Sequence, residues 1–277
     1  MLKIKPDEIT LFSNYIHKLT GISIDQSKAY LLETRFGRLL QETDSTTYAD
    51  LYHKARMEPG KHLEKKIIDA ITTNETLFFR DTGPFDLLRH KIIPELIDSR
   101  IAKANGTRPS LKIWSAACST GQEVYSIAIV LKELLAKGNY NIKLLGTDIS
   151  DAAVTQASYG DYNKFEIERG LPKDKLIKYF SSSGSRWKVS DELRSMATFR
   201  KINLLTPFTN LGKWDIVFCR NVAIYFTLED RQKLFSQIAQ VLEPDGYLII
   251  GSTESLTGVC PSFVPKRHLR TIFYTKR

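Results

Sequence analysis

Apolar residues in the first quarter of the chain recur at the spacing of a helix. Between Ile9 and Leu19 an apolar side chain follows at every third or fourth position, and Gly21 ends the run. Similar runs predict helices over residues 27–42, 46–57 and 62–72. We therefore expect residues 1–72 to form a small all-helical domain.

From about residue 110 onward, short apolar runs alternate with helical stretches. The apolar runs predict strands over residues 111–116, 142–148, 214–219, 246–251 and 271–274. Helical patterns lie at 122–136, 151–158 and 228–242. The alternation predicts an α/β domain over residues 73–277, with a doubly wound, parallel-type sheet and helices on both faces. A charged, serine-rich stretch at about 180–202 interrupts it, and we expect a small antiparallel β insertion there, with strands near 186–189 and 198–202.

Residues that carry chemistry follow three of the predicted strands. The turn at 117–123 contains small residues, so its backbone approaches a ligand closely. Asp148 ends the second strand, where an acid typically accepts hydrogen bonds from the ribose hydroxyls of an adenosine-containing cofactor. Arg220 and Asn221 end a third strand, and Tyr225 lies just beyond. Because ligands of a doubly wound sheet bind beyond the carboxyl ends of its strands, we expect these side chains to form one site.

The first of these turns argues against two common classes of ligand. It has one glycine, Gly121, so it lacks both the G-x-G-x-x-G fingerprint of nicotinamide cofactors and a glycine-rich phosphate loop. Glu123 lies at the expected N-terminus of the next helix, where its charge repels a phosphate and suits a cation. S-adenosylmethionine, which carries an ammonium and a sulfonium group, is such a cationic cofactor. The three features together favour a methyltransferase.

Five ordered motifs of the predicted α/β domain have counterparts in a known family, and the match extends over nearly the whole chain, including the helical N-terminal domain. They are TNETLFFR at 73–80, WSAACSTGQEVYS at 114–126, GTDI at 146–149, Asn203-Leu204, and FCRNVAIYF at 218–226, and GSTESL at 251–256 matches the family's ending after its late strand. Through them the chain resembles the CheR family of chemotaxis receptor glutamate methyltransferases. The resemblance implies a Rossmann-like methyltransferase sheet preceded by an all-helical domain.

The resemblance also implies which residues bind the cofactor. They are Asn74, Thr76, Arg80, Glu123, Asp148, Asn203, Leu204, Arg220 and Asn221. Asp148 is expected to hold the ribose, and Glu123 to face the methionine moiety or ribose side. Asn203 and Leu204 are expected against the adenine, and the pair at 220–221 beneath the cofactor. The turn departs from the family pattern in having Gln-Glu-Val where Glu-Glu-Pro is usual, but it keeps the second acid.

Arg80 and Tyr225 are the expected catalytic residues. The implied acceptor is a glutamate carboxylate, which has a reference pKa of about 4.3 and needs no general base near neutrality. The planar guanidinium of Arg80 suits the binding and orientation of a carboxylate, and Tyr225 is expected near the transferred methyl group. Each residue also has a structural alternative. Arg80 would cap or form an ion pair in the segment between the two domains, and Tyr225 would be a packed aromatic side chain. The structural alternative for Asn74 and Thr76 is a turn and a helix cap, and for Asp148 it is a helix cap.

The excess positive charge narrows the class of partner. The chain carries 40 Lys and Arg against 31 Asp and Glu, a net charge of +9. Residues 1–75 contain 11 of each sign, so the whole excess lies in residues 76–277. Five basic residues and no acidic one occur between Pro261 and Arg277, either as a solvated hairpin or as a surface that meets a partner. Because no tract interleaves aromatic with basic residues, we favour an acidic protein surface over nucleic acid.

Cysteine usage and hydropathy bear on the compartment. The three cysteines and five histidines are scattered without metal-ligand spacing, so we expect no metal site and free thiols in a reducing cytoplasm. The sequence has no apolar run of the roughly 18 residues that span a bilayer. The first residues also lack the apolar segment of a signal peptide. We expect a cytoplasmic monomer without direct membrane insertion.

The resemblance implies a methyl donor, a product and a partner. The donor is S-adenosylmethionine, the product S-adenosylhomocysteine, and the substrate the cytoplasmic helical bundle of methyl-accepting chemotaxis receptors. Lys28, Arg35 and Arg38 fall within an arc of roughly 80° on one helix, as a candidate docking stripe or an ordinary solvated face. In some family members the insertion binds a receptor C-terminal peptide by strand addition, for which the loop at 181–189 looks short here. The rival hypotheses are a methyltransferase acting on RNA and a non-catalytic binding module.

Overall fold

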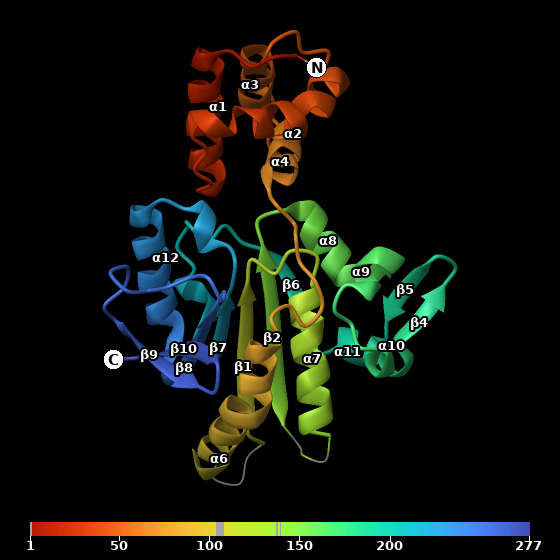
Figure 1. The fold of residues 1–277 in the computed structure, drawn as a ribbon, viewed down its shortest axis with the longest axis vertical. Helices are drawn as coiled ribbons and strands as arrows, with labels where there is room; N and C mark the ends of the chain where they lie inside the picture. Colours follow the sequence, from red (N-terminus) through yellow and green to blue (C-terminus); the bar gives the residue numbers. More distant parts are fainter. Residues whose placement is uncertain (1, 104–107, 137, 139) are drawn as a thin grey trace.

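The first part of the molecule is a bundle of helices. The computed structural model describes residues 2–103, 108–136, 138 and 140–277. The bundle consists of α1 (Pro6–Thr20), α2 (Ala29–Glu42), α3 (Tyr48–Met57) and α4 (His62–Ile71), with a 3-10 turn (Gln26–Lys28) before α2. In its core Phe12 packs against Phe36 and Tyr48, with ring centroids 5.3 and 6.1 Å apart. The all-helical N-terminal part is as predicted, and it stands above the sheet in Figure 1.

The rest of the chain is built around a seven-stranded sheet. Its strands are β1 (Ser110–Ala116), β2 (Asn141–Asp148), β6 (Ala197–Lys201), β7 (Trp214–Cys219), β8 (Leu242–Ile250), β9 (Phe263–His268) and β10 (Thr271–Lys276). They lie in the order β6-β2-β1-β7-β8-β10-β9, in which the first five are parallel to one another and the last two pairings are antiparallel. Alternate residues bury opposite faces, with Ile216 and Phe218 in one core and Val217 and Cys219 in the other.

Helices cover both faces of this sheet, which confirms the predicted α/β class. They are α5 (Thr82–Leu87), a π-helical turn (Leu88–Ile92), α6 (Ile93–Lys103), α7 (Gln122–Leu134), α8 (Asp151–Tyr159), α11 (Asp191–Arg194) and α12 (Leu228–Val241). α6 and α7 contribute to one core and α12 to the other, and Figure 1 shows α12 and α7 on opposite sides of the sheet. The apolar pattern of the sequence makes no prediction for residues 82–103, which form α5, the π-helical turn and α6.

The antiparallel insertion is present, but its extent differs from the prediction. It contains β3 (Asp161–Asn163), α9 (Lys164–Glu168), α10 (Lys173–Tyr179), β4 (Phe180–Ser183) and β5 (Arg186–Val189), with strand order β3-β5-β4. The strand expected near 198–202 is not part of it, because this strand is β6, which pairs in parallel with β2. The prediction was wrong because charged residues of β6 suggested an insertion. They instead lie at an edge of the main sheet, where Phe199 packs on Tyr125 with centroids 5.6 Å apart.

The helical bundle is attached to the carboxyl edge of the sheet. The contacts are hydrogen bonds from Asn203 Nδ2 to the Leu19 carbonyl (2.8 Å), from Ser23 N to the Tyr225 carbonyl (2.9 Å) and from Ser150 Oγ to Asp69 (2.7 Å), and a pair between His17 and Asp230 (2.8 Å). Three of these anchors lie in segments that follow parallel strands. The bundle therefore faces the strand ends at which the sequence predicts a site.

Arg35 has a structural task inside the bundle. Its guanidinium donates hydrogen bonds to the carbonyls of Ala70, Ile71 and Thr72 (2.8–3.2 Å) and to Thr73 Oγ1 (3.0 Å). These are carbonyls of the last turn of α4, which have no partner within that helix. Of the predicted docking stripe, Arg38 pairs with Glu42 (2.7 Å) while its side chain stays 85% exposed, and Lys28 pairs with Asp25 (3.4 Å).

Two glycines provide a matched test of the packing beneath the first turn. Gly121 has φ +96°, and an added Cβ would lie 2.9 Å from the Ala157 Cβ and 3.1 Å from the Tyr162 hydroxyl. We expect Gly121→Ala to lower the free energy of unfolding by about 2–4 kcal/mol, through left-handed strain and overpacking. Gly37 lies in α2 with open space around it, so Gly37→Ala should stabilise by about 0.5–1 kcal/mol. Chemical denaturation of both variants checks this, and equal stabilities would contradict the close packing of α7 on α8.

Candidate active site

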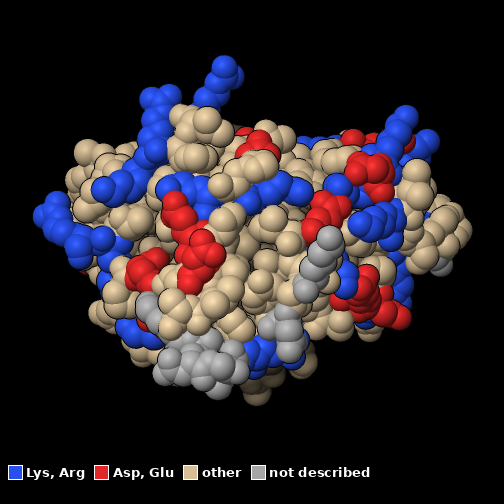
Figure 2. All heavy atoms as spheres, turned by 90° about the horizontal axis from the view of Figure 1, so that it is seen from below, with Lys and Arg blue, Asp and Glu red and all other residues tan. Residues whose placement is uncertain are grey.

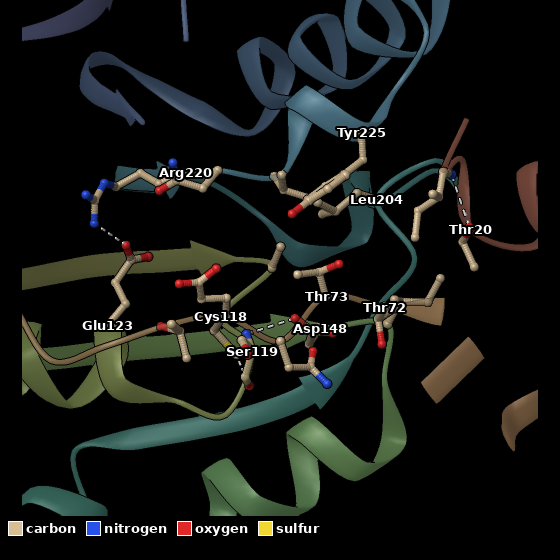
Figure 3. A pocket seen from close by; sticks show the side chains of 18 of the residues that line it. Thr20, Thr72, Thr73, Cys118, Ser119, Glu123, Asp148, Leu204, Arg220 and Tyr225 are labelled. Atoms are coloured by element: carbon tan, nitrogen blue, oxygen red, sulfur yellow. Dashed lines mark hydrogen bonds and ion pairs between the residues drawn. The ribbon is translucent and has the colours of Figure 1, made fainter. Parts of the chain in front are cut away.

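A cavity lies between the carboxyl edge of the sheet and the helical bundle. About 910 Å³ of space lies between its walls, part of it open to solvent. Its walls come from the end of α1, from residues 72–76 and Arg80, and from the segments that follow β1, β2, β6 and β7 (Figure 3). All the predicted site residues line it, namely Asn74, Thr76, Arg80, Glu123, Asp148, Asn203, Leu204, Arg220, Asn221 and Tyr225.

Asp148 is held rigidly at the end of β2. Its carboxylate accepts hydrogen bonds from the backbone N–H groups of Ser119 (2.8 Å) and Ser150 (3.0 Å). The residue is 7% exposed, and burial raises the pKa of its carboxyl above the ordinary value, although these N–H groups oppose the shift. An ionised carboxylate has about four acceptor positions, so this one retains capacity for hydroxyl groups of a ligand in the cavity.

The turn after β1 brings main chain to the cavity wall. Ala117 and Ser119 are left-handed, with φ of 59° and 50°, and the N–H of Cys118 donates to the Thr147 carbonyl (2.9 Å). This links the turn to the end of β2 beside Asp148. The hydroxyl of Ser119 is buried and has no hydrogen-bond partner in the part of the chain that the structure describes. A buried polar group without a partner is rare in proteins, and this one belongs to a cavity-lining residue.

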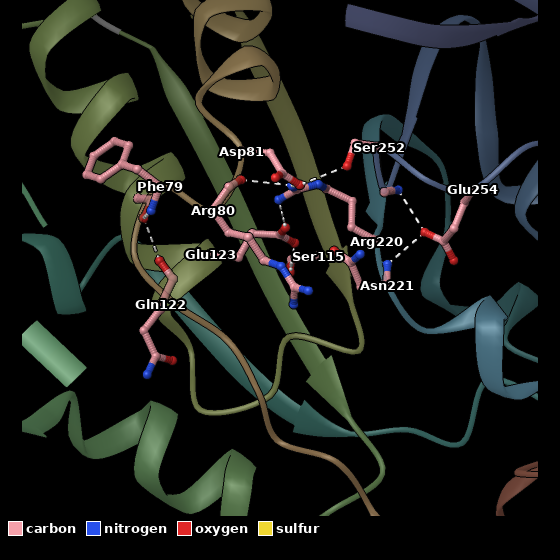
Figure 4. Close-up of polar contacts among 12 residues, drawn as sticks. Phe79, Arg80, Asp81, Ser115, Gln122, Glu123, Arg220, Asn221, Ser252 and Glu254 are labelled. Atoms are coloured by element: carbon pink, nitrogen blue, oxygen red, sulfur yellow. Dashed lines mark hydrogen bonds and ion pairs between the residues drawn. The ribbon is translucent and has the colours of Figure 1, made fainter. Parts of the chain in front are cut away.

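Arg220 is the centre of a buried ionic cluster. It donates to Glu123 (2.8 Å), to Asp81 (2.9 Å) and to the Arg80 carbonyl (2.8 Å), and its side chain is 2% exposed (Figure 4). Glu123 also accepts a hydrogen bond from Ser115 Oγ (2.8 Å). From the sequence we expect Glu123 to be an unpaired acid that faces a cation. In the structure Arg220 pairs with Glu123 and neutralises its charge. The acid therefore fixes the geometry of the wall as much as it contributes charge to the cavity.

The segment that connects the bundle to α5 passes along the cavity. Asn74, Thr76 and Arg80 line it from this segment. Arg80 donates one hydrogen bond, to the Glu75 carbonyl (3.0 Å), and has no carboxylate partner among the described residues. The N–H of Phe79 donates to Ser126 Oγ in α7 (2.9 Å), which fixes the segment beside the N-terminus of that helix.

Glu254 supports the wall formed by Asn221. Its Oε2 accepts from the N–H of Asn221 and from the N–H of Gly251, both at 2.7 Å. Asn221 is left-handed, with φ 57°. A Cβ on Gly251 would lie 2.6 Å from Glu254 Oε2 and 2.8 Å from Asn221 Nδ2, so only glycine fits there. Glu254 thus joins the ends of β7 and β8 at the edge of the cavity.

Asn203 and Tyr225 connect the site to the bundle. The Asn203 amide nitrogen donates to the Leu19 carbonyl, and its oxygen accepts from the N–H of Leu205 (3.0 Å). Both amide atoms therefore have one protein partner, and each retains one further hydrogen-bonding position. Figure 3 shows the Tyr225 ring projecting into the cavity opposite the turn after β1.

The sequence missed several residues that shape the site. Asp81 directly follows the matched motif at 73–80, and Glu254 lies in the matched motif at 251–256. The motifs therefore pointed to both residues, but the resemblance assigned neither of them a function. Thr20 and Ile22 line the cavity from the bundle, and the only local signal near them was a glycine that ends a helix.

Cysteine chemistry does not contribute to this site. Cys118 lines the cavity wall and Cys219 ends β7, and both are buried. Burial raises the pKa of both thiols well above the ordinary value, and nearby carboxylates raise it further. Both shifts disfavour the thiolate, which is the nucleophilic form of a cysteine. In the described residues, no group of His, Cys, Asp and Glu side chains is arranged to hold a metal ion.

Known proteins resemble this chain along nearly its whole length. Chemotaxis protein methyltransferase Cher2 of Pseudomonas putida is 38% identical over 253 residues, which cover 90% of each chain. Chemotaxis protein methyltransferase 1 of Pseudomonas aeruginosa is 38% identical over 257 residues, which cover 91% of each chain. A magnesium protoporphyrin IX methyltransferase from Synechocystis, solved with S-adenosylmethionine, is 17% identical; the match covers 76% of this chain and 94% of that one, with a TM-score of 0.35.

Two family models divide the chain between them. The all-alpha domain of CheR methyltransferases matches residues 7–72, and the SAM-binding domain of CheR methyltransferases matches residues 74–267. The second match contains most of the cavity wall, including Asp148, Arg220 and Tyr225. The chain therefore belongs to the CheR methyltransferase family, and its cofactor is S-adenosylmethionine.

Proposed function

We propose that this protein transfers a methyl group from S-adenosylmethionine to glutamate side chains of methyl-accepting chemotaxis receptors, giving glutamate methyl esters and S-adenosylhomocysteine. One observation carries the choice of a carboxylate as acceptor. Of the two arginines that line the cavity, Arg220 is buried and pairs with two carboxylates, whereas Arg80 has only a main-chain carbonyl as partner among the described residues. Arg80 is therefore free to pair with a carboxylate beside the cofactor.

The cavity fits the cofactor in its donor and acceptor groups. Asp148 keeps acceptor capacity for the two ribose hydroxyls, and Ser119 offers a buried hydroxyl without a protein partner among the described residues. The carboxylates of Asp148 and Glu123 line the same cavity and suit a cation. When bound, S-adenosylmethionine supplies an electrophilic methyl group on a sulfonium.

The residues of the chain then position the acceptor and exclude water. A glutamate carboxylate is ionised near neutrality, so no residue has to act as general base. Its charge is opposite to that of the sulfonium, and the two cancel as the methyl moves, so a dry site favours transfer. The bundle, through Thr20 and Ile22, and the segment that carries Arg80 both cover the cavity. Arg80 orients one face of the carboxylate and leaves a lone pair free for attack, while Tyr225 borders the methyl path.

Receptor docking is proposed to involve the exposed face of α2. Arg38 of α2 and Lys28, which immediately precedes that helix, are exposed and form only surface ion pairs, whereas Arg35 is bound to the end of α4. The stripe of the sequence prediction is therefore reduced to two cations. No helix of the described residues is long and apolar enough to cross a membrane. We propose that the protein acts as a cytoplasmic monomer, on the side of the membrane where the receptor's helical bundle lies.

The rival hypotheses receive less support. Figure 2 shows the end of the molecule away from the bundle, and on this face Lys and Arg are interspersed with Asp and Glu and form no continuous basic field for RNA. A non-catalytic module has no need to gather Arg80, Asp148 and Tyr225 around one cavity.

The reaction is tested by incubating the protein and radiolabelled S-adenosylmethionine with receptor-rich membranes, with RNA, or without an acceptor. We expect label in the receptor band that is released by mild base, because carboxyl methyl esters are base-labile. Label in RNA, or label in the receptor that survives base, would contradict the proposal.

Arg80→Ala tests the carboxylate anchor. Loss of a charge-assisted pair in a desolvated site costs about 2–5 kcal/mol, so we expect kcat/KM for the receptor to fall by roughly 100-fold or more. Cofactor affinity should stay within about threefold, because Asp148 is unchanged. Arg80→Lys keeps the charge but loses the planar fork and should recover part of the rate. Wild-type turnover by Arg80→Ala would remove Arg80 from this role.

Asp148→Asn tests the ribose contact, with Asp69→Asn as its matched control. The amide places an NH₂ group against one of two backbone donors, so cofactor affinity should fall by roughly tenfold, measured by calorimetry. Asp69 accepts from Ser150 Oγ but does not line the cavity, so its asparagine variant should bind normally. Because burial raises the pKa of Asp148, wild-type affinity should decline on acidification at a higher pH than an ordinary aspartate would cause. Equal affinities of the two variants would refute the contact.

A further inference from the structure

The turn between β9 and β10 stands at the same edge of the sheet as the active site. Tyr274 lies opposite Leu248 in the antiparallel pair of β10 and β8, so β10 begins at the level of Gly251, where β8 ends. β9 is antiparallel to β10 and so runs in the direction of β8, with His268 at the carboxyl edge. At this edge the turn approaches Gly83 in α5, where an added Cβ would lie 2.4 Å from Thr271 Oγ1.

This hairpin carries cations that nothing neutralises within the described residues. Lys266, Arg267 and Arg270 are exposed and form no ion pair there, and Arg267 donates to the Leu269 carbonyl (3.0 Å). Beside them, Leu269 is 73% exposed and Ile272 54% exposed. Charges on an edge strand often serve only to block aggregation, but Arg270 and Leu269 lie in the turn, beyond the strand.

A groove opens beside this contact between the hairpin and α5. It encloses about 1430 Å³ of space, open to solvent, between the start of α5, residues 250–254 and residues 268–272. Its floor is shared with the active site, because Asp81 pairs with Arg220 and Glu254 holds the Asn221 N–H.

Three acids line the groove, and two of them are engaged by other groups. Asp81 is paired with Arg220, and the Oε2 of Glu254 accepts two backbone N–H groups. Asp86 is exposed on the α5 wall. A partner with acidic groups along one side therefore meets complementary charge on the hairpin wall, around Arg270.

The edge strand itself is poorly suited to take up another strand. Pro265 lies in β9, opposite Tyr274 of β10, and supplies no N–H for an added strand. Lys266 and Arg267 place charge along the same edge. A partner must then bind through side chains, as the surface of a helix does.

We propose that the β9–β10 hairpin and the groove beside it form a docking surface for an acidic, amphipathic helix of the receptor substrate. The proposal rests on the proposed function for the identity of the substrate. The cations of the hairpin pair with acidic side chains of that helix, and Leu269 and Ile272 contact its apolar positions. The hairpin is then a second basic surface for the receptor, in addition to the proposed docking face of α2, and its groove shares Asp81 and Glu254 with the supports of the catalytic cavity.

The test compares Arg270→Glu with Arg277→Glu. Both residues are exposed and belong to the same hairpin, but Arg277 follows the opposite end of β10. Binding of a soluble fragment of the receptor's cytoplasmic helical bundle is measured with S-adenosylhomocysteine present. Charge reversal at a binding surface lowers the affinity and makes it less dependent on salt. We therefore expect the affinity for the fragment to fall roughly threefold in Arg270→Glu and roughly tenfold in the double variant Lys266→Glu with Arg270→Glu. Both losses should shrink at high salt, and Arg277→Glu should stay within about twofold.

Unchanged fragment binding by the double variant would overturn the docking surface. A loss seen only with phosphatidylserine vesicles, and not with the receptor fragment, would overturn it as well, because the hairpin would then face lipid. Affinity for S-adenosylhomocysteine reports that each variant is folded. Binding is read separately from methyl transfer, so a wild-type protein that binds the fragment but forms no methyl ester refutes the proposed function alone.

Discussion

The buried guanidinium of Arg220 holds together three parts of the chain that meet at the active site. It follows β7, and it binds Glu123 at the start of α7 and Asp81 with the Arg80 carbonyl in the connecting segment. A charge buried to this degree is costly unless it is paired and hydrogen-bonded, so the three segments cannot separate without leaving unpaired charges in the interior. The position of the connecting segment, and with it that of Arg80, follows from this one side chain.

Backbone strain is concentrated around the same cavity. Of the eight described non-glycine residues with positive φ, five lie in the connecting segment or in the turns after β1 and β7: Phe79, Asp81, Ala117, Ser119 and Asn221. Each costs about 1–3 kcal/mol and persists only where the surroundings enforce it. Here the enforcement is visible, since the N–H groups of Phe79, Ser119 and Asn221 each donate to a fixed side-chain oxygen. The cavity wall is therefore held rigid both by predicted site residues and by side chains that the sequence did not predict for the site.

Local patterns predicted what depends on local forces. The spacing of apolar residues, with Gly21 as the end of the first run, predicted the helices of the bundle. The rule that ligands bind beyond strand ends predicted that Asp148, Asn221 and Tyr225 share one cavity. The pairing of Arg220 with Glu123 and the attachment of Arg35 to α4 depend on contacts between segments that are distant in the sequence. The local pattern of apolar residues carries no information on such contacts. The misplacement of β6 has the same origin, because a half-exposed edge strand and a strand of an insertion have similar sequences.

The two arginines of the cavity differ in what their surroundings leave free, and the proposed reaction depends on that difference. Arg220 is neutralised by Glu123 and Asp81, so it fixes the wall without competing for an acidic acceptor. Arg80 lies in the same wall, yet its guanidinium meets only the Glu75 carbonyl among the described residues. A cationic cofactor and an anionic acceptor need opposite partners within one small space, which Asp148 and Arg80 provide from separate segments. If Arg220 lacked its carboxylates, its charge would oppose the sulfonium, and so the buried ion pairs are part of the chemistry as well as of the fold.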